Sequence, residues 1–450
     1  MKRMLPKELQ FTLPTSLQEQ WSALEACHTQ LPVHSIRKNP YKFTTAFEAN
    51  EPVPWCSNAY YLTERPLYTA DPLFHAGTYY VQEASSMFLE QAIRQCLDIS
   101  KPQFVLDLCA APGGKTTLIA SLLNKESLLV SNEVIQSRAS ILKENCVKWG
   151  MPHVLIANND PSHFSKLPHS FSALLIDAPC SGSGLFRKKN EYIDDWNESL
   201  VHLCAERQKR ILHDSYHTLA QDGLLVYMTC SLSQEENEDM VDYLMSHFAL
   251  ENLSLKIPSE WNIHHSISNT GASSYRLMPH VLKGEGFFIA CFRKKDGKAI
   301  QTPFAKVAKP NVNFNADLFY SSKDYETFLF QDMLKIVPYN MMPIVEAYKA
   351  KLKIIHSGIQ IGKWQKQELI PSHDLAMFAY INYEKKISVN LNTALRYLKK
   401  ETIEIESAEK GWFLITYNDI PLGWIKHLGN RINNYYPTNY RIVSKNILTS

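Results

Sequence analysis

The middle of the chain alternates short apolar, β-branched segments with longer helix-like segments, and this alternation limits the fold more than any other feature. The strand-like runs are FVLDLCA, LLVSNEV, HVLIANND, ALLIDAP, GLLVYMTC and GEGFFIACFRK. Helix-like stretches stand between them, such as QSRASILKENCVKWG, which should stop at Gly150. Strands that alternate with helices predict an α/β fold, a parallel doubly wound sheet with helices on both faces. We expect this unit to span residues 98–295.

The sequence on either side of this unit predicts further domains. Residues 1–97 hold two amphipathic stretches and a Pro- and aromatic-rich middle, which we interpret as an N-terminal α+β region. Residues 296–373 begin rich in Lys, Pro and Asn, and we expect a linker and a connecting domain. Residues 374–450 predict a small β-domain rich in Lys, Trp and Tyr, with a hairpin that turns at Asn418-Asp419.

Length and composition exclude several classes of protein. With 450 residues, 45% hydrophobic and 20% charged, the chain is typical of a soluble protein of several domains. Its start, MKRMLPKELQFTLP, lacks the apolar core of a secretory signal, and no apolar run could span a bilayer. The nine cysteines do not have the spacing of a zinc site. We therefore expect a cytoplasmic monomer without a metal, away from membranes.

The stretch DLCAAPGGKTT invites comparison with a phosphate-binding loop, because it ends in Gly114-Lys115-Thr116. That loop requires a glycine where this chain has Cys109, and Pro112 removes an N–H that the loop would use. The stretch therefore argues against a nucleotide hydrolase. It predicts instead a Gly-rich turn between a strand and a helix, the place where doubly wound sheets bind nucleotide-like ligands.

Acidic residues at the ends of the next three strands indicate which ligand this turn serves. Glu133 ends the second strand, Asp160 the third and Asp177 the fourth. Carboxylates at these positions suit a ribose, a purine and a sulfonium cation better than a triphosphate. We therefore predict that the turn binds S-adenosylmethionine. The alternative is that each acid merely caps a helix.

Two cysteines are expected at the same edge of the sheet. Cys180 follows the fourth strand in DAPCSGSG, and Cys230 follows the strand GLLVYM in MTCSLSQEENE. A thiolate suits methylation at carbon 5 of a pyrimidine, which becomes nucleophilic only after a group adds to carbon 6. Asp177 could hold the added state at the nitrogen edge of the ring. The residues alone do not decide which cysteine attacks, because DNA cytosine methyltransferases use a Pro-Cys dipeptide like Pro179-Cys180.

The three motifs DLCAAPGGKTT, DAPCSGSG and TCSLSQEENE, with GTYYVQEASSM upstream, resemble the RNA cytosine carbon-5 methyltransferases of the Nop2/Sun family. The resemblance covers residues 75–295. The full length and the C-terminal PLGWIKHLGNRINNYYP resemble the bacterial RsmF branch of the family. That branch methylates small-subunit (16S) ribosomal RNA and carries a C-terminal PUA-like domain. The resemblance thus implies RNA-binding regions at both ends of the chain.

The resemblance also implies roles for individual residues. Cys230 would be the catalytic nucleophile, and Cys180 would assist product release by helping the enzyme–RNA adduct to break down. Arg187 and Lys188, in FRKKNE, would contact RNA phosphates, with a solvated loop as the equal alternative. The residues expected to bind S-adenosylmethionine are Cys109, Ala110, Ala111, Pro112, Gly113, Gly114, Lys115, Glu133, Asp160 and Asp177.

The expected partner is ribosomal RNA or the small ribosomal subunit, with the target base turned out of its helix to meet Cys230. A Lys/aromatic surface of the C-terminal domain would grip RNA, although most of its aromatic rings should fill the small core: Trp412, Trp424, Lys426, Tyr435, Tyr436 and Arg441. Two alternatives remain open, a transfer RNA methyltransferase and a non-catalytic RNA-binding factor of ribosome assembly.

Overall fold

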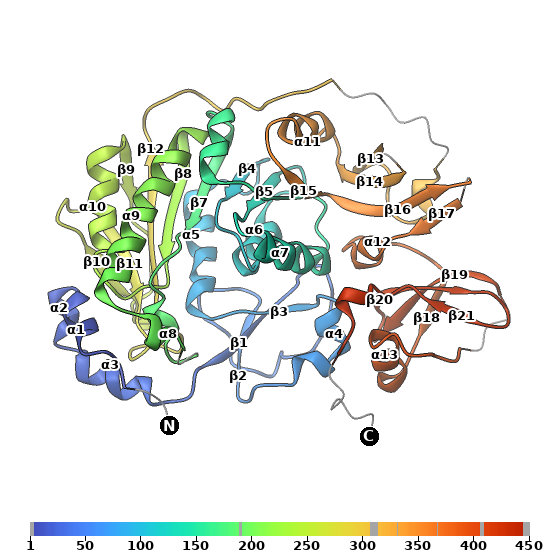
Figure 1. Ribbon diagram of the computed structural model, residues 1–450, viewed down its shortest axis with the longest axis horizontal. Helices are drawn as coiled ribbons and strands as arrows, with labels where there is room; N and C mark the ends of the chain where they lie inside the picture. Colours follow the sequence, from blue (N-terminus) through green and yellow to red (C-terminus); the bar gives the residue numbers. More distant parts are fainter. Residues whose placement is uncertain are drawn as a thin grey trace.

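The computed structural model describes residues 4–188, 191–306, 314–330, 332–366, 368–405 and 409–443. A ten-stranded sheet crosses its centre in the order β10-β11-β12-β8-β7-β4-β5-β6-β15, with β9 beside β12 (Figure 1). Five neighbouring strands of this sheet are parallel, as the alternation predicted: β4 (Phe104–Asp107), β5 (Leu128–Asn132), β6 (Val154–Ala157), β7 (Phe171–Asp177) and β8 (Leu219–Thr229).

Antiparallel strands extend the sheet at both ends. Beyond β8 lie β9 (Leu250–Leu253), β10 (His264–Ile267), β11 (Ser273–Leu277) and β12 (Phe287–Lys294), of which the sequence predicted only the last. At the other end, β15 (Ile354–Ser357) pairs with β6. Because β15 belongs to the segment predicted as a linker and connecting domain, that segment completes the central sheet.

Helices cover both faces of the sheet, as expected. Neighbouring residues of β4 divide between the two cores, since Val105 packs on one face and Leu106 on the other. The first face carries α5 (Leu89–Cys96), α6 (Gly114–Leu122) and α7 (Gln136–Trp149). The second carries α9 (Glu198–Ser215), α10 (Glu238–His247) and α11 (Met342–Lys349), and a short α8 (Glu191–Asp195) precedes α9. Helix α7 ends at Gly150, whose φ of 82° is the left-handed helix stop that the sequence predicted.

The N-terminal region is the predicted α+β unit. It contains a three-stranded antiparallel sheet in the order β2-β1-β3. Its elements are α1 (Glu8–Thr12), α2 (Thr15–Gln18), α3 (Trp21–His28), β1 (His34–Lys38), β2 (Ala59–Leu62), α4 (Pro72–His75) and β3 (Tyr79–Val81). Leu9 and Leu24 of its first helices share a core with Phe186 and Trp196, so this region packs on the central unit.

Two small sheets follow the central unit. The first contains β13 (Tyr325–Phe330), β14 (Met333–Pro338), β16 (Ile359–Gln365) and β17 (Glu368–Pro371), and α12 (His373–Met377) follows it. The second contains β18 (Lys386–Ser388), β19 (Gly411–Tyr417), β20 (Ile420–His427) and β21 (Ile432–Asn434), and α13 (Leu391–Leu398) lies between β18 and β19 in the chain. The predicted hairpin joins β19 to β20, with both turn residues left-handed at φ values of 48° and 61°.

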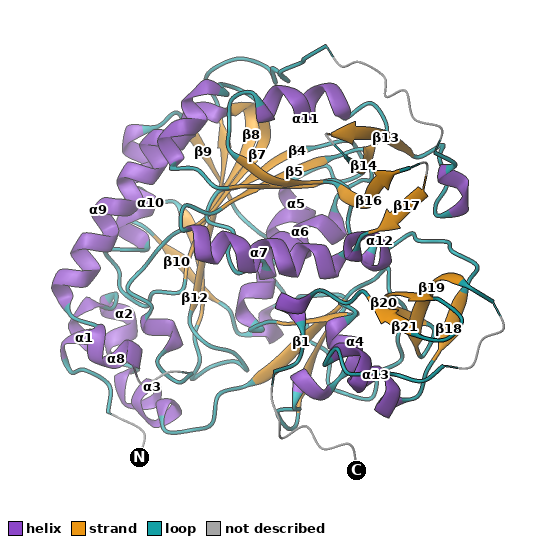
Figure 2. Ribbon diagram, turned by 45° about the vertical axis from the view of Figure 1, so that its right-hand side comes forward, coloured by secondary structure: helices purple, strands orange, loops and turns teal. Residues whose placement is uncertain are grey.

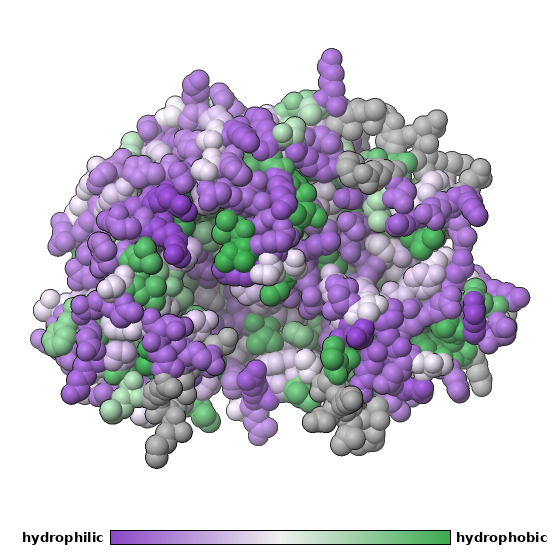
Figure 3. All heavy atoms as spheres, in the orientation of Figure 1, coloured by the Kyte–Doolittle hydropathy of each residue, from purple (hydrophilic) through white to green (hydrophobic). Residues whose placement is uncertain are grey.

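The C-terminal sheet lies against the N-terminal region, although the two are far apart in the sequence (Figure 2). Ala76, just after α4, belongs to the same apolar core as Leu395 of α13 and Ile425 of β20. The face drawn in Figure 3 is mostly hydrophilic. Within the described ranges, no helix is both long enough and apolar enough to cross a membrane.

Candidate active site

A cavity of about 290 Å³ opens where β4, β7 and β8 reach their carboxyl ends. This is the edge at which the sequence predicted the Gly-rich turn and the two cysteines. The cavity also takes one wall from the N-terminal region, around β3. Its lining residues are Tyr80, Val81, Gln82, Glu83, Ser86, Cys109, Ala110, Ala111, Pro112, Gly114, Lys115, Asp177, Leu185, Cys230, Gly286 and Phe287.

The Gly-rich turn forms one side of this cavity. Gly113 precedes α6 with a φ of 114°, a conformation that side-chain-bearing residues rarely adopt. Lys115 follows in the first turn of the helix, and its Nζ donates to Oδ2 of Asp177 at 2.6 Å. Burial would lower the pKa of the Lys115 ammonium, but Asp177 outweighs it and the pKa is raised. The pair therefore keeps a fixed cation and anion inside the cavity.

The predicted acids differ in how they stand to this cavity. Asp177 lines it. Glu133 comes directly after β5, its side chain is buried, and its Oε1 accepts from the backbone N–H of Ile135 at 2.9 Å. Asp160 stands three residues beyond the end of β6, where it caps the 3₁₀-helix Pro161–Lys166 by accepting from the N–H of Ser162. Asp160 is therefore not at the strand end itself, and its geometry is that of the helix cap named as the alternative.

One further acid, Asp107, was quoted in the motif but given no role. It ends β4, is fully buried, and accepts a hydrogen bond from Thr116 Oγ1 to its Oδ2 at 2.6 Å. Burial raises its pKa to about 7, and the neighbouring Asp177 adds to the shift. Its other oxygen has no hydrogen-bond partner among the described residues. The end of β4 therefore carries a buried carboxyl group that changes charge at about pH 7.

The two cysteines meet, as expected, at this edge. Their Sγ atoms are 3.1 Å apart, and both thiols are free. Cys230 lines the cavity, and Cys180 lies directly behind it. The hydrogen bond to Cys230, burial and the charge of Glu236 together raise the pKa of the Cys180 thiol well above its ordinary value. The Cys180 thiol therefore tends to keep its proton.

Glycines let the cysteine loops lie this close together. Gly184 donates its N–H to the carbonyl of Cys230 at 2.8 Å and accepts from the N–H of Gly286 at 3.2 Å. A Cβ atom on Gly184 would lie 2.6 Å from both the Cys230 and the Gly286 carbonyl oxygens. The loops after β7, after β8 and before β12 therefore pack backbone against backbone.

The two predicted phosphate contacts differ in exposure. Arg187 has a buried guanidinium, with Nε 2.8 Å from Oε2 of Glu285 and Nη2 donating to the carbonyl of Gly284. Lys188 is exposed. This geometry arises because Glu285 precedes β12, far from Arg187 in the sequence, and it leaves only Lys188 on a solvated loop.

The rings of the C-terminal Lys/aromatic set divide evenly between core and surface, whereas most were expected in the core. Trp424 and Tyr436 are 1% exposed and fill the small core. Trp412 and Tyr435 pack edge to face at the surface, and Lys426 lies over the Trp412 ring while it pairs with Glu368. Arg441 is exposed. Two rings and two cations of the set are thus accessible, at least in part, to a partner.

Several lining residues were not predicted as site residues. Most lie in the upstream motif GTYYVQEASSM or at the start of the last predicted strand, and one follows the motif DAPCSGSG: Tyr80, Val81, Gln82, Glu83, Ser86, Gly286, Phe287 and Leu185. Glu83 joins these segments, because its carboxylate accepts from the N–H groups of Ser85, Ser86 and Glu285 at 2.8 Å each. Polar residues within GTYYVQEASSM, such as Gln82 and Glu83, were the sequence signal that could have identified this wall. Within the described ranges, the site included, no group of three or more His, Cys, Asp or Glu residues could hold a metal ion.

Three segments of the chain match families of known proteins. Residues 94–293 match the family described as 16S rRNA methyltransferase RsmB/F, residues 5–84 the N-terminal domain of RsmF, and residues 384–442 its PUA domain. Ribosomal RNA small subunit methyltransferase F of Shewanella woodyi is 31% identical over 429 residues, which is 90% of this chain and 88% of that one. The chain belongs to the RsmB/F family of 16S rRNA methyltransferases. The protein of the same description from Vibrio atlanticus is 31% identical over 86% of this chain and 85% of its own.

Solved structures agree with the fold. A methyltransferase homologue from Pyrococcus horikoshii is 28% identical, with a TM-score of 0.53, and the match covers 64% of this chain and 93% of that one. NSun6 from the same organism, solved with SFG, has a TM-score of 0.53 at 20% identity over 65% of this chain and 99% of its own. The predicted family is thus confirmed, and with it the class of enzyme, a ribosomal RNA methyltransferase that depends on S-adenosylmethionine.

Proposed function

We propose that this protein transfers a methyl group from S-adenosylmethionine to carbon 5 of a cytosine in small-subunit ribosomal RNA, through a covalent bond between Cys230 and carbon 6. The observation that carries the proposal is the pair of thiols, 3.1 Å apart, at a cavity lined by the Gly-rich turn. The relatives named ribosomal RNA small subunit methyltransferase F support the choice of RNA.

The donor set of the cavity fits S-adenosylmethionine. Asp177 offers a carboxylate to a cationic ligand, beside the turn formed by residues 109–115. Glu133 stands behind this wall, near enough for its charge to raise the pKa of Cys109, which burial raises first. Asp160 would have to reach the ligand from the start of its 3₁₀-helix. When bound, the ligand supplies an electrophilic methyl group to the edge that carries Cys230.

The proposed reaction has a balanced course. The thiolate of Cys230 adds to carbon 6, and the ring electrons this releases make carbon 5 nucleophilic. Carbon 5 then takes the methyl group, and the electrons of the broken S–C bond stay with the departing sulfur. Loss of the proton from carbon 5 and cleavage of the Cys230–carbon 6 bond restore the ring. Cys180, after releasing its own proton to water, takes the carbon-5 proton, and Asp177 holds the nitrogen edge of the ring in its added state.

The order of ionisation supports these two roles. The Cys180 thiol keeps its proton chiefly because it is hydrogen-bonded to Cys230. Cys230, which lines the cavity, is thus the cysteine placed to attack. Once the Cys230 sulfur is bonded to carbon 6, its hydrogen bond with Cys180 weakens. Cys180 is then a stronger acid than it was before the addition. Cys180 can then ionise and act as a base, at the stage when the adduct must break down.

The test is transfer of a labelled methyl group from S-adenosylmethionine to unmodified small-subunit rRNA, free and assembled, followed by nucleoside analysis. We expect label in 5-methylcytidine, none with Cys230→Ala, and with Cys180→Ala an RNA–protein adduct that survives a denaturing gel. The double variant should form no adduct. Label in another nucleoside, or full activity of Cys230→Ala, would overturn the chemistry, and methylation of transfer RNA alone would overturn the substrate.

A further inference from the structure

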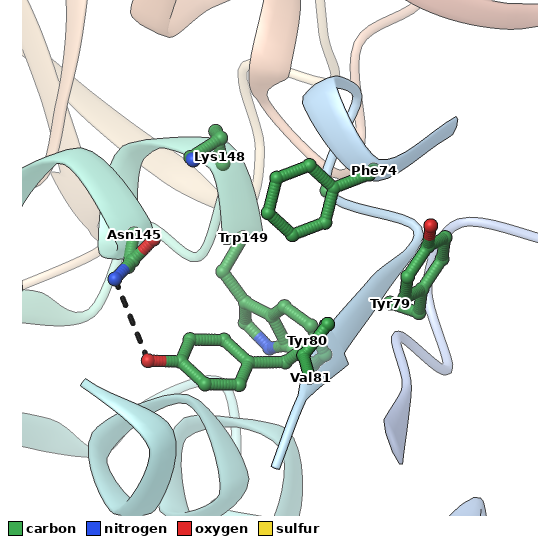
Figure 4. Close-up of a pocket in the computed structure, with 8 residues that line it drawn as sticks. Phe74, Tyr79, Tyr80, Val81, Asn145, Lys148 and Trp149 are labelled. Carbon is green, nitrogen blue, oxygen red and sulfur yellow. Dashed lines mark hydrogen bonds between the residues drawn. The ribbon is translucent and has the colours of Figure 1, made fainter. Parts of the chain in front are cut away.

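A second cavity, of about 160 Å³, opens beside strand β3 (Figure 4). It lies where the N-terminal region meets the end of helix α7. Its lining residues come from α4, β3 and α7: Phe74, Gly77, Tyr79, Tyr80, Val81, Asn145, Lys148 and Trp149. The methyl-transfer reaction proposed above uses none of its rings.

The walls of this second cavity are aromatic and held in place. The Trp149 indole donates to Ser121 Oγ at 2.9 Å, and the Arg37 guanidinium lies 4.6 Å from its ring centre. Tyr79 donates its hydroxyl to Asp71 at 2.6 Å. Phe74 and Tyr80 are only half-buried, and Figure 4 shows their rings on opposite sides of Trp149. The fixed inner rings thus support two outer rings that remain accessible.

The polar groups of this cavity favour an anionic ligand with hydrogen-bonding edges. Lys148 projects its ammonium 5.2 Å from the ring centre of Phe74. Its partner Glu144 is 3.2 Å away, one turn back on α7, and none of the eight lining residues carries a carboxylate. Asn145 adds a side-chain amide. Aromatic rings for stacking, an amide for a base edge and a lysine for a phosphate are the groups with which proteins bind unpaired nucleotides.

The second cavity shares part of its lining with the first. Tyr80 and Val81 line both. Asn145 Nδ2 donates to the carbonyl of Pro112, in the Gly-rich turn, at 2.9 Å and lies 3.4 Å from the Tyr80 hydroxyl. On its far side, α4 packs against the C-terminal sheet through Ala76. A strand of RNA that reached from the C-terminal domain to Cys230 would therefore pass this cavity.

We infer that this cavity receives an unpaired base of the substrate RNA, from a nucleotide that flanks the methylated one. The base lies between Phe74 and Tyr80, and its phosphate meets Lys148. The inference rests on the proposed function for the identity of the RNA. Holding this neighbouring base would fix the position of the RNA strand, so that the target nucleotide, and not the next one along, enters the first cavity.

The test measures RNA binding separately from methyl transfer, using a small-subunit rRNA fragment in fluorescence anisotropy. Phe74→Leu, which keeps apolar volume but removes the ring, should weaken binding about 10-fold, whereas Phe74→Tyr should bind as the parent does. Lys148→Gln should weaken binding and lower the slope of log Kd against log salt by about 1. S-adenosylmethionine affinity should not change in any of them, which also reports folding.

Lys209→Gln is the matched control. Lys209 also lies over an aromatic ring, that of Tyr243, and pairs with a glutamate one turn back, but on the opposite face of the sheet. It should bind RNA unchanged. An RNA with an abasic nucleotide at one position beside the target should bind the parent more weakly. The same change should leave RNA binding by Phe74→Leu unaltered.

Parent-like RNA binding by Phe74→Leu and Lys148→Gln, with no response to an abasic neighbour, would overturn the inference. A parent protein that binds the fragment but methylates nothing would count against the proposed function. In that case, weaker binding by the Phe74 and Lys148 variants would still support the nucleotide site. The two failures are therefore distinguishable.

Discussion

One buried carboxylate, that of Glu236, joins the two loops that carry the cysteines. Its Oε2 accepts from Ser181 Oγ and Ser231 Oγ, both at 2.5 Å, and these serines directly follow Cys180 and Cys230. Its Oε1 accepts from the N–H of Ser181 at 2.9 Å and from Gln208 Nε2 at 3.1 Å. Since all four partners donate, only a group with two accepting oxygens satisfies them. Glu236 thereby sets the spacing of the thiols without touching the cavity.

Replacing Glu236 by Gln should therefore impair catalysis more than its volume change suggests. The amide would point two N–H donors at serine hydroxyls or at the Ser181 N–H, which loosens one loop at a cost of about 1–3 kcal/mol. We expect kcat for methyl transfer to fall roughly 10-fold or more, with KM for S-adenosylmethionine unchanged. Glu235→Gln, next in the chain and with 41% of its side chain exposed, is the control and should keep full activity. An equal loss in both variants would contradict this role.

Asp107 makes stability depend on pH in a predictable direction. Its pKa is raised from 3.8 to about 7, chiefly by burial, so between these values the folded protein binds a proton that the unfolded chain has released. Stability from this group is complete at low pH and is lost as the pH rises through that window, by about 1.4 kcal/mol per pH unit.

The Asp107→Asn variant removes this dependence while still accepting from Thr116. Its Tm relative to the parent should therefore rise steadily between pH 4 and pH 7, a window set by the two pKa values. Differential scanning calorimetry of both proteins across the range measures the difference directly, because all other titrating groups are shared. A difference that does not vary with pH would rule out a raised pKa at Asp107.

At the level of elements, the catalytic edge depends on three loops that touch through their backbones. Gly184→Ala would place a methyl group 2.6 Å from two carbonyl oxygens, and neither can yield as a flexible side chain would. We expect methyl transfer to fall at least 10-fold as the cysteine loops separate, while S-adenosylmethionine still binds to the turn after β4. Gly271→Ala is the comparison, because its Cβ meets nothing within 4 Å; with a φ of 79° it strains the backbone away from the cysteine loops, and it should remain active. Calorimetric binding and labelled-methyl assays separate the two effects.

The sequence predicts the elements whose pattern is local. Strands β4 to β8 are continuous apolar runs between helices. Residue type alone marks the end of α7 at Gly150 and the turn between β19 and β20 at Asn418-Asp419. The strands β9, β10 and β11 were not predicted, because all three are short and partly polar, and β11 (SSYRL) is polar in sequence although it is buried. Strand β15 was missed for another reason, since its partner β6 lies far back in the chain and no local signal marks such a pairing.

The same distinction holds for the site. The Gly-rich turn, Asp177 and the two cysteines could be placed at one edge because they follow predicted parallel strands. The β3 wall of the cavity comes from another domain, and the burial of Arg187 depends on Glu285, so neither could be predicted from spacing. The part of the site that follows the parallel strands could therefore be predicted from the sequence, whereas the part that depends on tertiary packing between domains could not.

For the whole molecule, the segment after residue 295 is part of the catalytic unit. Strand β15 covers the edge of β6, and α11 buries Ile344, Val345 and Tyr348 in one of the two main cores. A chain that ends at residue 300 would expose this edge and lose those three side chains from the core, at about 2 kcal/mol each. We expect its Tm to fall by roughly 10–20 °C and its solutions to aggregate on the exposed strand.

Light scattering and calorimetry of the truncated and full-length chains check this expectation. A chain ending after α12, at residue 380, keeps β15 and α11 and is the informative control. It should retain most of the parent's Tm. If residues 1–300 proved as stable and soluble as the full chain, the later segment would be an independent domain that only rests on the sheet.

The pairing of β6 with β15 also has a consequence for synthesis of the chain. Strand β6 ends at residue 157 and its partner at residue 357, so about 200 further residues must be translated before the sheet can close. At bacterial elongation rates of about 5–20 residues per second, the wait is on the order of 10–40 seconds. The catalytic sheet of this nascent protein thus has an open edge during much of its own translation, and chaperones that shield hydrogen-bonding strand edges should find it a substrate at that stage.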